Sequence, residues 1–488
     1  MRPEGAHRAM DFGAVGDGQT MDTAALQAGL NACHESGGGT FLLTPGNYLS
    51  GALRLPSNVT LHLEKGARLV GSTALDDYHI DGERVGLIHA RDAENVAIAG
   101  EGVIDGQGDA FADWDSMKPG GSSAAWPDGP VSVPSRPGNL VVFSNCRNVV
   151  LRDITIRDAP FWTVHLDGCE GGRLLDLRIR NNPLVPNNDG IHCTSCRNVF
   201  IRGCDIAAGD DCIAVTGIND HAAIIPGFIG YDMSTENIVV SDCVLSSRSS
   251  GIRVGYGHND VRHCSFSNCI IRASSRGVGV FARNPGSVED IVFSDMQIET
   301  KRYRGAWWGN AECVQVSAVR IREDEPVGRV RGIRFRGIRA RGENGILVCG
   351  LEDGRVEDIV FDEVDLAICH SEDADEAGVV DTRPAWKEDL GMRTMDLAAV
   401  QAEGVAGLTL RNLAIRWGDR VPGCFRDNVR VERFSRFLLE GLSCQTPPRG
   451  AVLALGQGRD ARLRGWGFVE GDPPWVSVED VDGMADER

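Results

Sequence analysis

Short strand-like runs recur along most of the chain at a nearly fixed interval. Each run begins with a polar residue followed by β-branched residues or leucine, as in Asn148-Val149-Val150-Leu151. A matching run begins at Arg173, 25 residues later, and another at Asn198 after a further 25. Helical spacing is essentially absent between residues 40 and 365, so the repeat predicts an all-β solenoid, a parallel β-helix. Further runs begin at Asn58, Asn95, Asn237, Asp290 and Asp358.

The two ends of the chain depart from this repeat. Asp22 or Thr23 can cap a helix that ends at the glycine run 37–39, with Ala25, Leu26, Leu30 and Cys33 on one face. We therefore expect a single β-helix domain over residues 1–488. Its parts are an N-terminal cap at 1–39, coils with loop insertions at 40–400, and terminal coils and a cap at 401–488. Longer gaps place the insertions, where binding residues are often found, at 105–135, 217–236, 300–325 and 365–400.

The composition excludes several classes of partner. The chain has 50 basic and 69 acidic residues and a net charge of −19, so no positive field attracts nucleic acid or an anionic membrane. No run approaches the roughly 18 apolar residues of a membrane helix. The start, Met1 to His7, lacks the apolar segment of a secretory signal, which predicts a cytoplasmic protein for the chain as given and a secreted one if the start has been trimmed. The oligomeric state is left open.

The 15 cysteines are interpreted as small buried apolar residues in a reducing compartment rather than as a disulfide framework. Four of them lack the second closely spaced pair of a zinc knuckle, so we expect no metal and no other cofactor. These four are Cys193, Cys196, Cys204 and Cys212.

Three acids stand out within one repeat. Asp189 precedes Asp210 and Asp211 by 21 and 22 residues, close to one coil. Stacked coils lie about 4.8 Å apart, so the three carboxylates should crowd one wall. Crowding raises the pKa of at least one acid, so that one stays protonated while its neighbours are ionised, which glycoside hydrolysis requires. The alternative is that all three are turn residues.

Several motifs resemble glycoside hydrolase family 28, the polygalacturonase family of right-handed parallel β-helices. The resemblance extends from Phe12 to about Val316 and includes the runs 12–18 and 61–67 and the Arg136-Pro137 pair. Asn187-Asn188-Asp189 is similar to the family's Asn-x-Asp motif, and Gly209-Asp210-Asp211 to its Gly/Gln-Asp-Asp motif. The resemblance implies that Asp210 is the general acid, that Asp189 and Asp211 activate water in a single inverting displacement, and that Asn187 lies in the substrate site.

Two other motifs of that family are absent. Its Gly-His-Gly motif corresponds to Gly251-Ile252-Arg253, which has no histidine. Its Arg-x-Lys motif, which holds the galacturonate carboxylate, corresponds to Gly279 and Phe281. Other cations would have to bind an acidic sugar, and a neutral sugar stays an alternative. The candidates for substrate binding are Arg253, Arg276 and Arg283, and Arg253 could instead be a surface ion-pair partner.

Three more residues are candidates for substrate binding. Trp307 and Trp308 lie in the insertion at 300–325 and could form a subsite wall, or they could seal the loop against the solenoid. His258 could enter the cleft from its turn, or it is an exposed loop histidine. His192 is interpreted as a strand residue that supports Asp189.

The favoured function is an inverting glycoside hydrolase acting on a pectin-like or related oligosaccharide or polysaccharide. Two alternatives share the fold: a polysaccharide lyase or uronate epimerase, and an inactive glycan-binding β-helix. Retention of all three acids favours the hydrolase, because a binding module has no use for crowded carboxylates.

Overall fold

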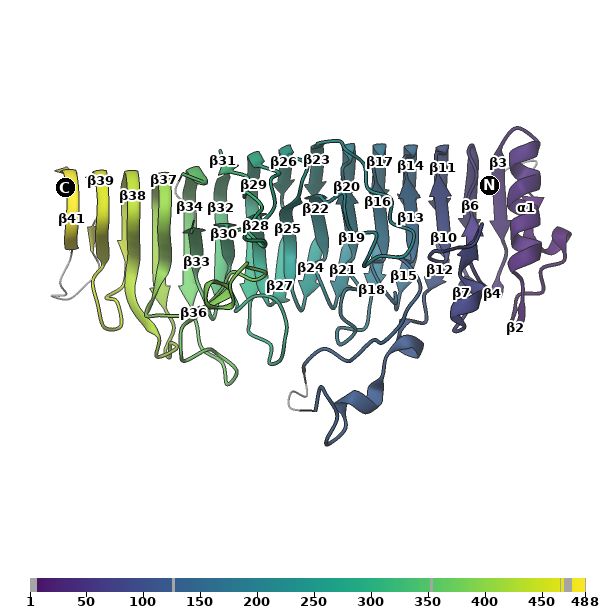
Figure 1. Ribbon diagram of the computed structural model, residues 1–488, viewed down its shortest axis with the longest axis horizontal. Helices are drawn as coiled ribbons and strands as arrows, with labels where there is room; N and C mark the ends of the chain where they lie inside the picture. The colour runs from purple at the N-terminus through teal and green to yellow at the C-terminus, as the bar shows by residue number, and fades with distance from the viewer. Residues whose placement is uncertain (1–6, 125–127, 352–353, 466, 469–475, 488) are drawn as a thin grey trace. The chain divides into compact units, whose positions relative to one another are not determined.

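Figure 1 shows the computed structural model of the chain, which describes residues 7–124, 128–351, 354–465, 467–468 and 476–487. The chain forms two compact units, Met1–Val244 and Leu245–Arg488, and each is described by itself. The prediction of a single domain stays a prediction. Residues 1–6, on which the predicted localisation rests, lie outside the described residues.

Unit 1 is a right-handed parallel β-helix in which successive coils place their strands in three parallel sheets (Figure 1). The first sheet contains β1 (His7–Arg8), β3 (Gly39–Leu43), β6 (Val59–Leu63), β11 (Glu94–Ala99), β14 (Arg147–Arg152), β17 (Glu170–Leu175), β20 (Arg197–Arg202) and β23 (Thr235–Ser241). The second contains β2 (Asp17–Met21), β4 (Gly46–Ser50), β7 (Ala67–Gly71), β12 (Val103–Asp105), β15 (Thr155–Arg157), β18 (Arg178–Arg180) and β21 (Asp205–Ala208). The third contains β5 (Leu53–Arg54), β10 (Ile88–Arg91), β13 (Val141–Ser144), β16 (Val164–Asp167), β19 (Ile191–Thr194) and β22 (Ile213–Gly217).

The recurring asparagines have a backbone role in the coils. Asn95 and Asn148 adopt left-handed backbone angles, with φ of 56° each, which asparagine tolerates better than most residues. Their side-chain amides form a ladder, because Asn148 Nδ2 donates to Asn95 Oδ1 at 3.0 Å and Asn95 Nδ2 to Asn58 Oδ1 at 2.9 Å. The predicted alignment of Asn148 with Arg173 is wrong: Arg173 pairs with Val150, because the coils differ in length.

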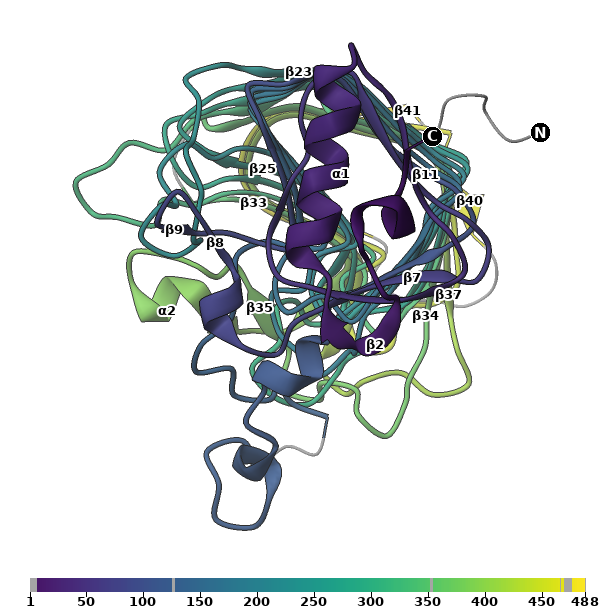
Figure 2. The same cartoon turned by 90° about the vertical axis from the view of Figure 1, so that its right-hand side faces the viewer.

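The predicted N-terminal helix is confirmed as α1 (Thr23–Glu35), which covers the end of unit 1 in Figure 2. Leu26, Leu30 and Cys33 are buried as expected, whereas Ala25 is half-buried. The side chain of Asp22 makes no cap hydrogen bond to the helix. It accepts hydrogen bonds from the N–H groups of the preceding glycine-containing turn instead.

Unit 2 is also a right-handed parallel β-helix, built from longer strands. One face contains β25 (Ser250–Gly257), β28 (Arg276–Ala282), β30 (Val314–Ala318), β33 (Ile346–Gly350), β37 (Leu397–Trp417), β38 (Phe425–Cys444), β39 (Leu453–Arg464) and β41 (Val476–Glu487). The other two faces share the long strands β29 (Val288–Thr300), β32 (Arg334–Gly342), β34 (Val356–Ile368) and further parts of β37 and β38. The short strands β26 (Val261–Ser267) and β31 (Val330–Arg331) belong to one of these faces, and β27 (Ile270–Ser274) and β40 (Gly467–Phe468) belong to the other. β24 (Val244–Ser247) contains the boundary between the units. Both units confirm the all-β prediction.

The predicted insertion ranges contain the long connections but also some strands, since the range 300–325 includes β30 and the range 365–400 includes the end of β34 and the start of β37. In unit 1, residues 106–140 carry the short 3-10 helices η3 (Gly108–Phe111) and η4 (Trp114–Met117), and β8 (His79–Ile80) pairs with β9 (Glu83–Arg84). In unit 2, the segment 301–313 connects β29 to β30. The segment 369–396 carries β35 (Val379–Asp381), α2 (Glu388–Gly391) and β36 (Met392–Thr394). The remaining short helices are η1 (Ala9–Phe12) and η2 (Leu75–Asp77).

The cysteines belong to the core, as expected. All 15 are free thiols, and every one except Cys369 is buried. Cys169 and Cys196 occupy the same position in successive coils and donate to the carbonyl oxygens of Phe143 and Leu166 in the coil before. The predicted reducing compartment stays a prediction. Over the part of the chain that the structure describes, no helix has the length and apolarity to cross a membrane.

Candidate active site

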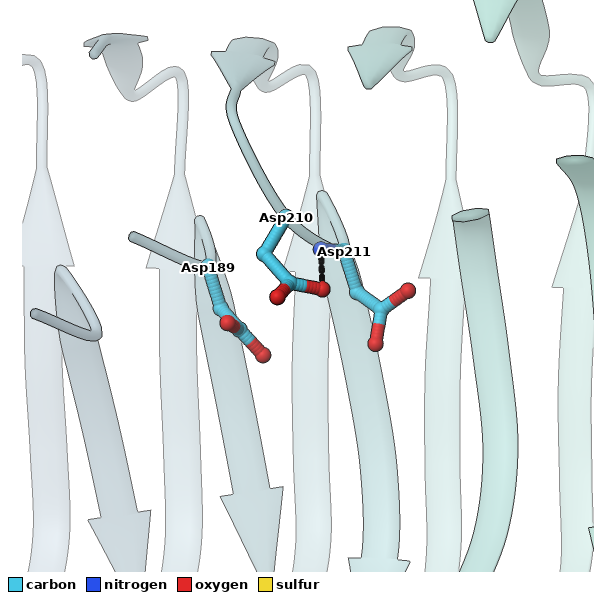
Figure 3. Close-up of side chains that lie close together, drawn as sticks. All are labelled: Asp189, Asp210 and Asp211. Atoms are coloured by element: carbon cyan, nitrogen blue, oxygen red, sulfur yellow. Dashed lines mark hydrogen bonds between the residues drawn. The ribbon is translucent and has the colours of Figure 1, made fainter. Parts of the chain in front are cut away.

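The three predicted acids lie at one corner of unit 1, where the second sheet gives way to the third. Asp189 precedes β19, and Asp210 and Asp211 lie between β21 and β22. Ile191 pairs with Ile213, which places Asp189 one coil away from Asp211. Figure 3 shows Asp210 between the other two, and one carboxylate oxygen of each acid lies within 4.8 Å of the others. The structure therefore brings the three acids together, as the repeat predicted.

Two glycines and an asparagine make this close approach possible. A Cβ at Gly190 would lie 2.4 Å from the carbonyl oxygen of Cys212, and a Cβ at Gly209 would lie 2.4 Å from another backbone oxygen. Asn188 joins the two turns, because its Oδ1 accepts a hydrogen bond from the Gly209 N–H at 2.6 Å. Its Nδ2 donates to the backbone of its own turn at 2.8 Å. The distance between the acids is thus set by backbone packing.

His192 supports Asp189, in agreement with its interpretation from the sequence. Its Nδ1 lies 3.2 Å from Asp189 Oδ2, and its Nε2 lies 3.1 Å from Thr216 Oγ1. The Trp162 ring stacks on the imidazole with centroids 3.7 Å apart. His192 has no exposed surface, so it can orient Asp189 but cannot contact a substrate directly.

Asn187 touches the central acid, so the structure places this predicted residue in the acid cluster. Its φ of 59° turns the amide towards Asp210, and Nδ2 donates to Asp210 Oδ2 at 3.2 Å. The Asp211 N–H donates to the other oxygen, Asp210 Oδ1, at 2.9 Å. Both oxygens of Asp210 are therefore held in place, which fixes the orientation of the carboxyl group.

Arg136 is a member of the site that sequence reasoning placed only in a fold motif. It comes from the end of the insertion at 106–140 and donates from Nη2 to Asn187 Oδ1 at 2.9 Å. Its guanidinium carbon lies 3.9 Å from the centre of the Phe161 ring. Burial lowers its pKa to about 10, against the opposing charges of Asp210 and Asp189, so the side chain is still cationic at neutral pH. The Arg136-Pro137 pair was the feature of the sequence that could have identified Arg136 as a site residue.

The three carboxylates lie close enough together to repel one another when they are ionised. Two unit charges 4.8 Å apart repel by roughly 3 to 4 kcal/mol at an effective dielectric constant of 20. Each hydrogen bond that Asp210 accepts contributes about 1.5 to 3 kcal/mol to its ionised form. The mutual repulsion of the three acids is therefore opposed by the two hydrogen bonds that Asp210 accepts and by the charge of Arg136.

The same oxygens define the place where a cation could bind. Within the described residues, Asp189, Asp210 and Asp211 form the one group of three metal-ligand side chains with its donor atoms this close. Carboxylate oxygens suit hard cations such as Ca²⁺. The expectation of no metal stays a prediction, which hydrolysis assays with and without a chelator would test.

The remaining predicted residues lie in unit 2, where three of them gather around two aromatic rings. The guanidinium of Arg253 lies 4.9 Å from the Tyr256 ring, and that of Arg276 lies 5.1 Å from the Phe281 ring. Arg283 approaches both rings, at 5.9 and 4.7 Å. Phe281, which stands where a cation was expected from the family motif, thus holds cations by its π face.

The predicted substrate-binding residues of unit 2 differ in their exposure to solvent. Arg283 is 1% exposed and donates to the Ser317 carbonyl and hydroxyl oxygens, so it is an interior residue. His258 Nε2 lies 2.6 Å from a carboxylate oxygen of Glu325. Trp307 is 4% exposed, whereas Trp308 is 37% exposed. Of the two tryptophans, only Trp308 therefore presents a large surface to solvent, and substrate binding by these residues stays a prediction.

Comparison with known proteins places the chain among carbohydrate-active proteins. Residues 33–305, more than half of the chain, match the family Glycosyl hydrolases family 28. A probable polygalacturonase of Vitis vinifera is 28% identical over 62% of this chain and 62% of its own length. An exopolygalacturonase of Zea mays is 26% identical over 52% of this chain and 62% of its own length. The chain thus spans less than two thirds of the length of these curated relatives.

A solved structure agrees with the fold. The hyperthermoactive exopolygalacturonase of Thermotoga maritima superimposes with a TM-score of 0.63 at 20% identity, covering 85% of this chain and 93% of the other. The likeness extends beyond the matched residues, over the coils of both units. The chain belongs to glycosyl hydrolase family 28.

Proposed function

We propose that this protein is an inverting glycoside hydrolase that cleaves a pectin-like or related glycan or oligosaccharide. The observation that carries the proposal is the buried cluster of three carboxylates, with an oxygen of each within 4.8 Å of the others. Family membership and the names of the relatives support the substrate class. Asp210 would donate a proton to the leaving oxygen, while Asp189 and Asp211 would bind and activate the attacking water.

The distance between the acids suits one bridging water. Oxygens no more than 4.8 Å apart can both accept a hydrogen bond from a single water at about 2.7 Å. Asp189 and Asp211 lie one coil apart and face the same way, so both can bind that water. Asp210 lies between them with both oxygens held by Asn187 and the Asp211 N–H. The chain thus supplies a proton donor and a pair of acceptors without further groups.

The stereochemistry of the product tests this assignment. Two carboxyl groups about 5 to 5.5 Å apart are usual in retaining enzymes, and inverting pairs are usually about 6.5 to 9.5 Å apart. This site has three acids, and two of them can hold the attacking water jointly. The distance rule for two carboxyl groups therefore does not decide the outcome here. We expect NMR of the nascent reducing end to show the inverted anomer. A retained anomer would mean that one aspartate attacks the sugar itself.

The reaction class is tested separately with pectic and neutral oligosaccharides. We expect new reducing ends and no ultraviolet absorbance from an unsaturated product. Unsaturated product would instead indicate a lyase, and binding without any product would indicate a glycan-binding β-helix. Arg253→Ala tests whether Arg253 helps to bind the substrate, and Arg262→Ala on β26, where the side chain is 38% exposed, is measured alongside it.

The pH dependence of kcat/KM should show whether the charge of Arg136 takes part in the reaction. Its charge favours ionisation of Asp210 and Asp189, so Arg136→Gln makes both harder to ionise. The acid then stays protonated to a higher pH, and the base ionises only at a higher pH. We therefore expect both limbs of the bell-shaped profile of kcat/KM to shift to higher pH. Arg136→Lys keeps the charge and should move the profile much less. An unchanged profile in Arg136→Gln would show that the charge has no part in the reaction.

A further inference from the structure

An exposed tryptophan in unit 2 is held in a rigid turn. Trp308 is 37% exposed, although the turn that carries it is fixed on both sides. The Gly309 N–H donates to Asp381 Oδ2 at 2.9 Å, and Arg383 Nη2 donates to the Trp307 carbonyl at 2.9 Å. Gly309 has a φ of 92°, and a Cβ there would lie 3.2 Å from Arg276 Cβ, so the turn accepts only glycine. A large aromatic ring is therefore presented to solvent in a fixed position.

A buried ion pair provides this rigidity. Arg383 donates to both oxygens of Asp381, from Nε at 2.9 Å and from Nη2 at 2.8 Å. Asp381 is 1% exposed. Burial opposes its ionisation, but Arg383 and the charge of Arg276 hold its pKa below the ordinary value. The pair is thus fully charged at neutral pH, and truncating either partner would leave a buried charge uncompensated.

Arg383 has N–H groups beside the Trp308 ring that make no hydrogen bond to the described residues. Its Nε and Nη2 are used by Asp381 and Trp307, whereas Nη1 has no hydrogen-bond partner in the part of the chain that the structure describes. The side chain is 28% exposed, and its guanidinium lies 5.2 Å from the Trp308 ring. The nearby acids are Asp381, which Arg383 pairs with, and Glu312, which is buried. Arg383 therefore has two N–H groups without a partner among the described residues, on a partly exposed side chain next to an aromatic ring.

This combination selects for one kind of ligand. A flat indole binds the C–H face of a sugar ring by apolar contact. Guanidinium N–H groups bind a carboxylate more strongly than they bind a hydroxyl, because the bond is charge-assisted. Resting on the proposed function, we propose that Trp308 and Arg383 form a subsite for an acidic sugar, with the ring of the sugar against Trp308 and a carboxylate on Arg383 Nη1. This subsite would supply a cation for the sugar carboxylate, which Gly279 and Phe281 cannot do.

The subsite is tested by binding rather than by hydrolysis. The full-length Asp210→Asn protein is titrated calorimetrically with trigalacturonate and with its methyl ester, which has the same sugars without charge. We expect Trp308→Ala to weaken the binding of both ligands about tenfold and Trp308→Phe to restore most of the affinity. Arg383→Lys keeps the charge but has a single nitrogen, which Asp381 would hold, and lacks the separate Nη1 group. The preference for the acid over the ester should therefore fall about tenfold while ester binding changes little.

A measurement without any change at Arg383 guards against misfolding of that variant. Acrylamide quenching of the exposed indole should fall when trigalacturonate is added, and Trp308→Phe should lack this protected component. Equal affinities in Trp308→Ala and the parent, or equal preference for acid and ester in the parent, would overturn the subsite. If the wild-type protein hydrolyses no glycan but these effects are seen, the proposed function fails and the subsite stands. If it hydrolyses a glycan and these effects are missing, the proposed function stands and the subsite fails.

Discussion

We expect Asp210→Asn to lower kcat for glycoside hydrolysis by about 10²- to 10⁴-fold and to leave KM nearly unchanged, because Asp210 is the proposed general acid. The amide has almost the same shape as the carboxyl group, and its oxygen can still accept the hydrogen bond from the Asp211 N–H. It cannot give a proton to the departing oxygen, so the loss falls on the chemical step. Initial rates of reducing-end formation, measured over a range of substrate concentrations and pH, separate kcat from KM.

Asp205→Asn is the matched control for this prediction. Asp205 is on β21, five residues before Asp210, and forms an ion pair with Arg180 on a side chain that is 39% exposed. Surface pairs of this kind contribute about 0 to 1 kcal/mol, so stability and rate should both change little. Assignment of Asp210 as the acid would be refuted if Asp210→Asn kept more than a tenth of the wild-type rate.

The two other acids should behave as one unit. If Asp189 and Asp211 bind the same water, either single asparagine variant already loses most of the activation, and the double variant loses little more. Independent roles would instead give losses that multiply. The same assay at substrate saturation distinguishes these cases. His192→Gln should have a milder effect, because His192 is buried and lies beside Asp189.

Short local patterns in the sequence predict much of the fold. The asparagine that begins several of the runs has a backbone role, because it adopts φ of 56° to 62° and joins an amide ladder. Likewise, Asp189 and Asp211 lie one coil apart because Ile191 pairs with Ile213. Coil length is not local: Arg173 pairs with Val150 rather than Asn148, since turns lengthen or shorten without changing the strand pattern. The period could thus be predicted, but not each register.

Contacts between distant segments are the part that sequence alone could not give. Arg136 reaches Asn187 from an insertion 51 residues earlier, and no periodicity relates the two. Arg383 fixes the Trp307 carbonyl over a separation of 76 residues. Exposure is a further example, because Trp307 and Trp308 are identical in type and adjacent, yet packing buries only the first. Such differences depend on how insertions fold back on the coils.

Phe335→Ala should destabilise unit 2 more than any surface substitution, by about 3 to 5 kcal/mol. Phe335 is fully buried in a stack formed by one phenylalanine from each of four successive coils. Its ring centroid lies 4.9 Å from that of Phe293 and 4.7 Å from that of Phe361, with the planes nearly parallel. Truncation removes two ring contacts at once and leaves a cavity that rigid coils cannot close. Thermal and denaturant unfolding measure the loss.

The position of a ring in the stack gives the sharper comparison. Phe361 has a phenylalanine on one side and pairs with Leu410 on the other, so Phe361→Ala loses one aromatic contact and should be less damaging than Phe335→Ala. Val292→Ala on β29, at a side chain that is 38% exposed, should stay within about 0.5 kcal/mol of the wild type. Equal losses at Phe335 and Val292 would show that the stack does not stabilise the coils, whereas a graded order from Val292 through Phe361 to Phe335 ties stability to the stacked rings themselves.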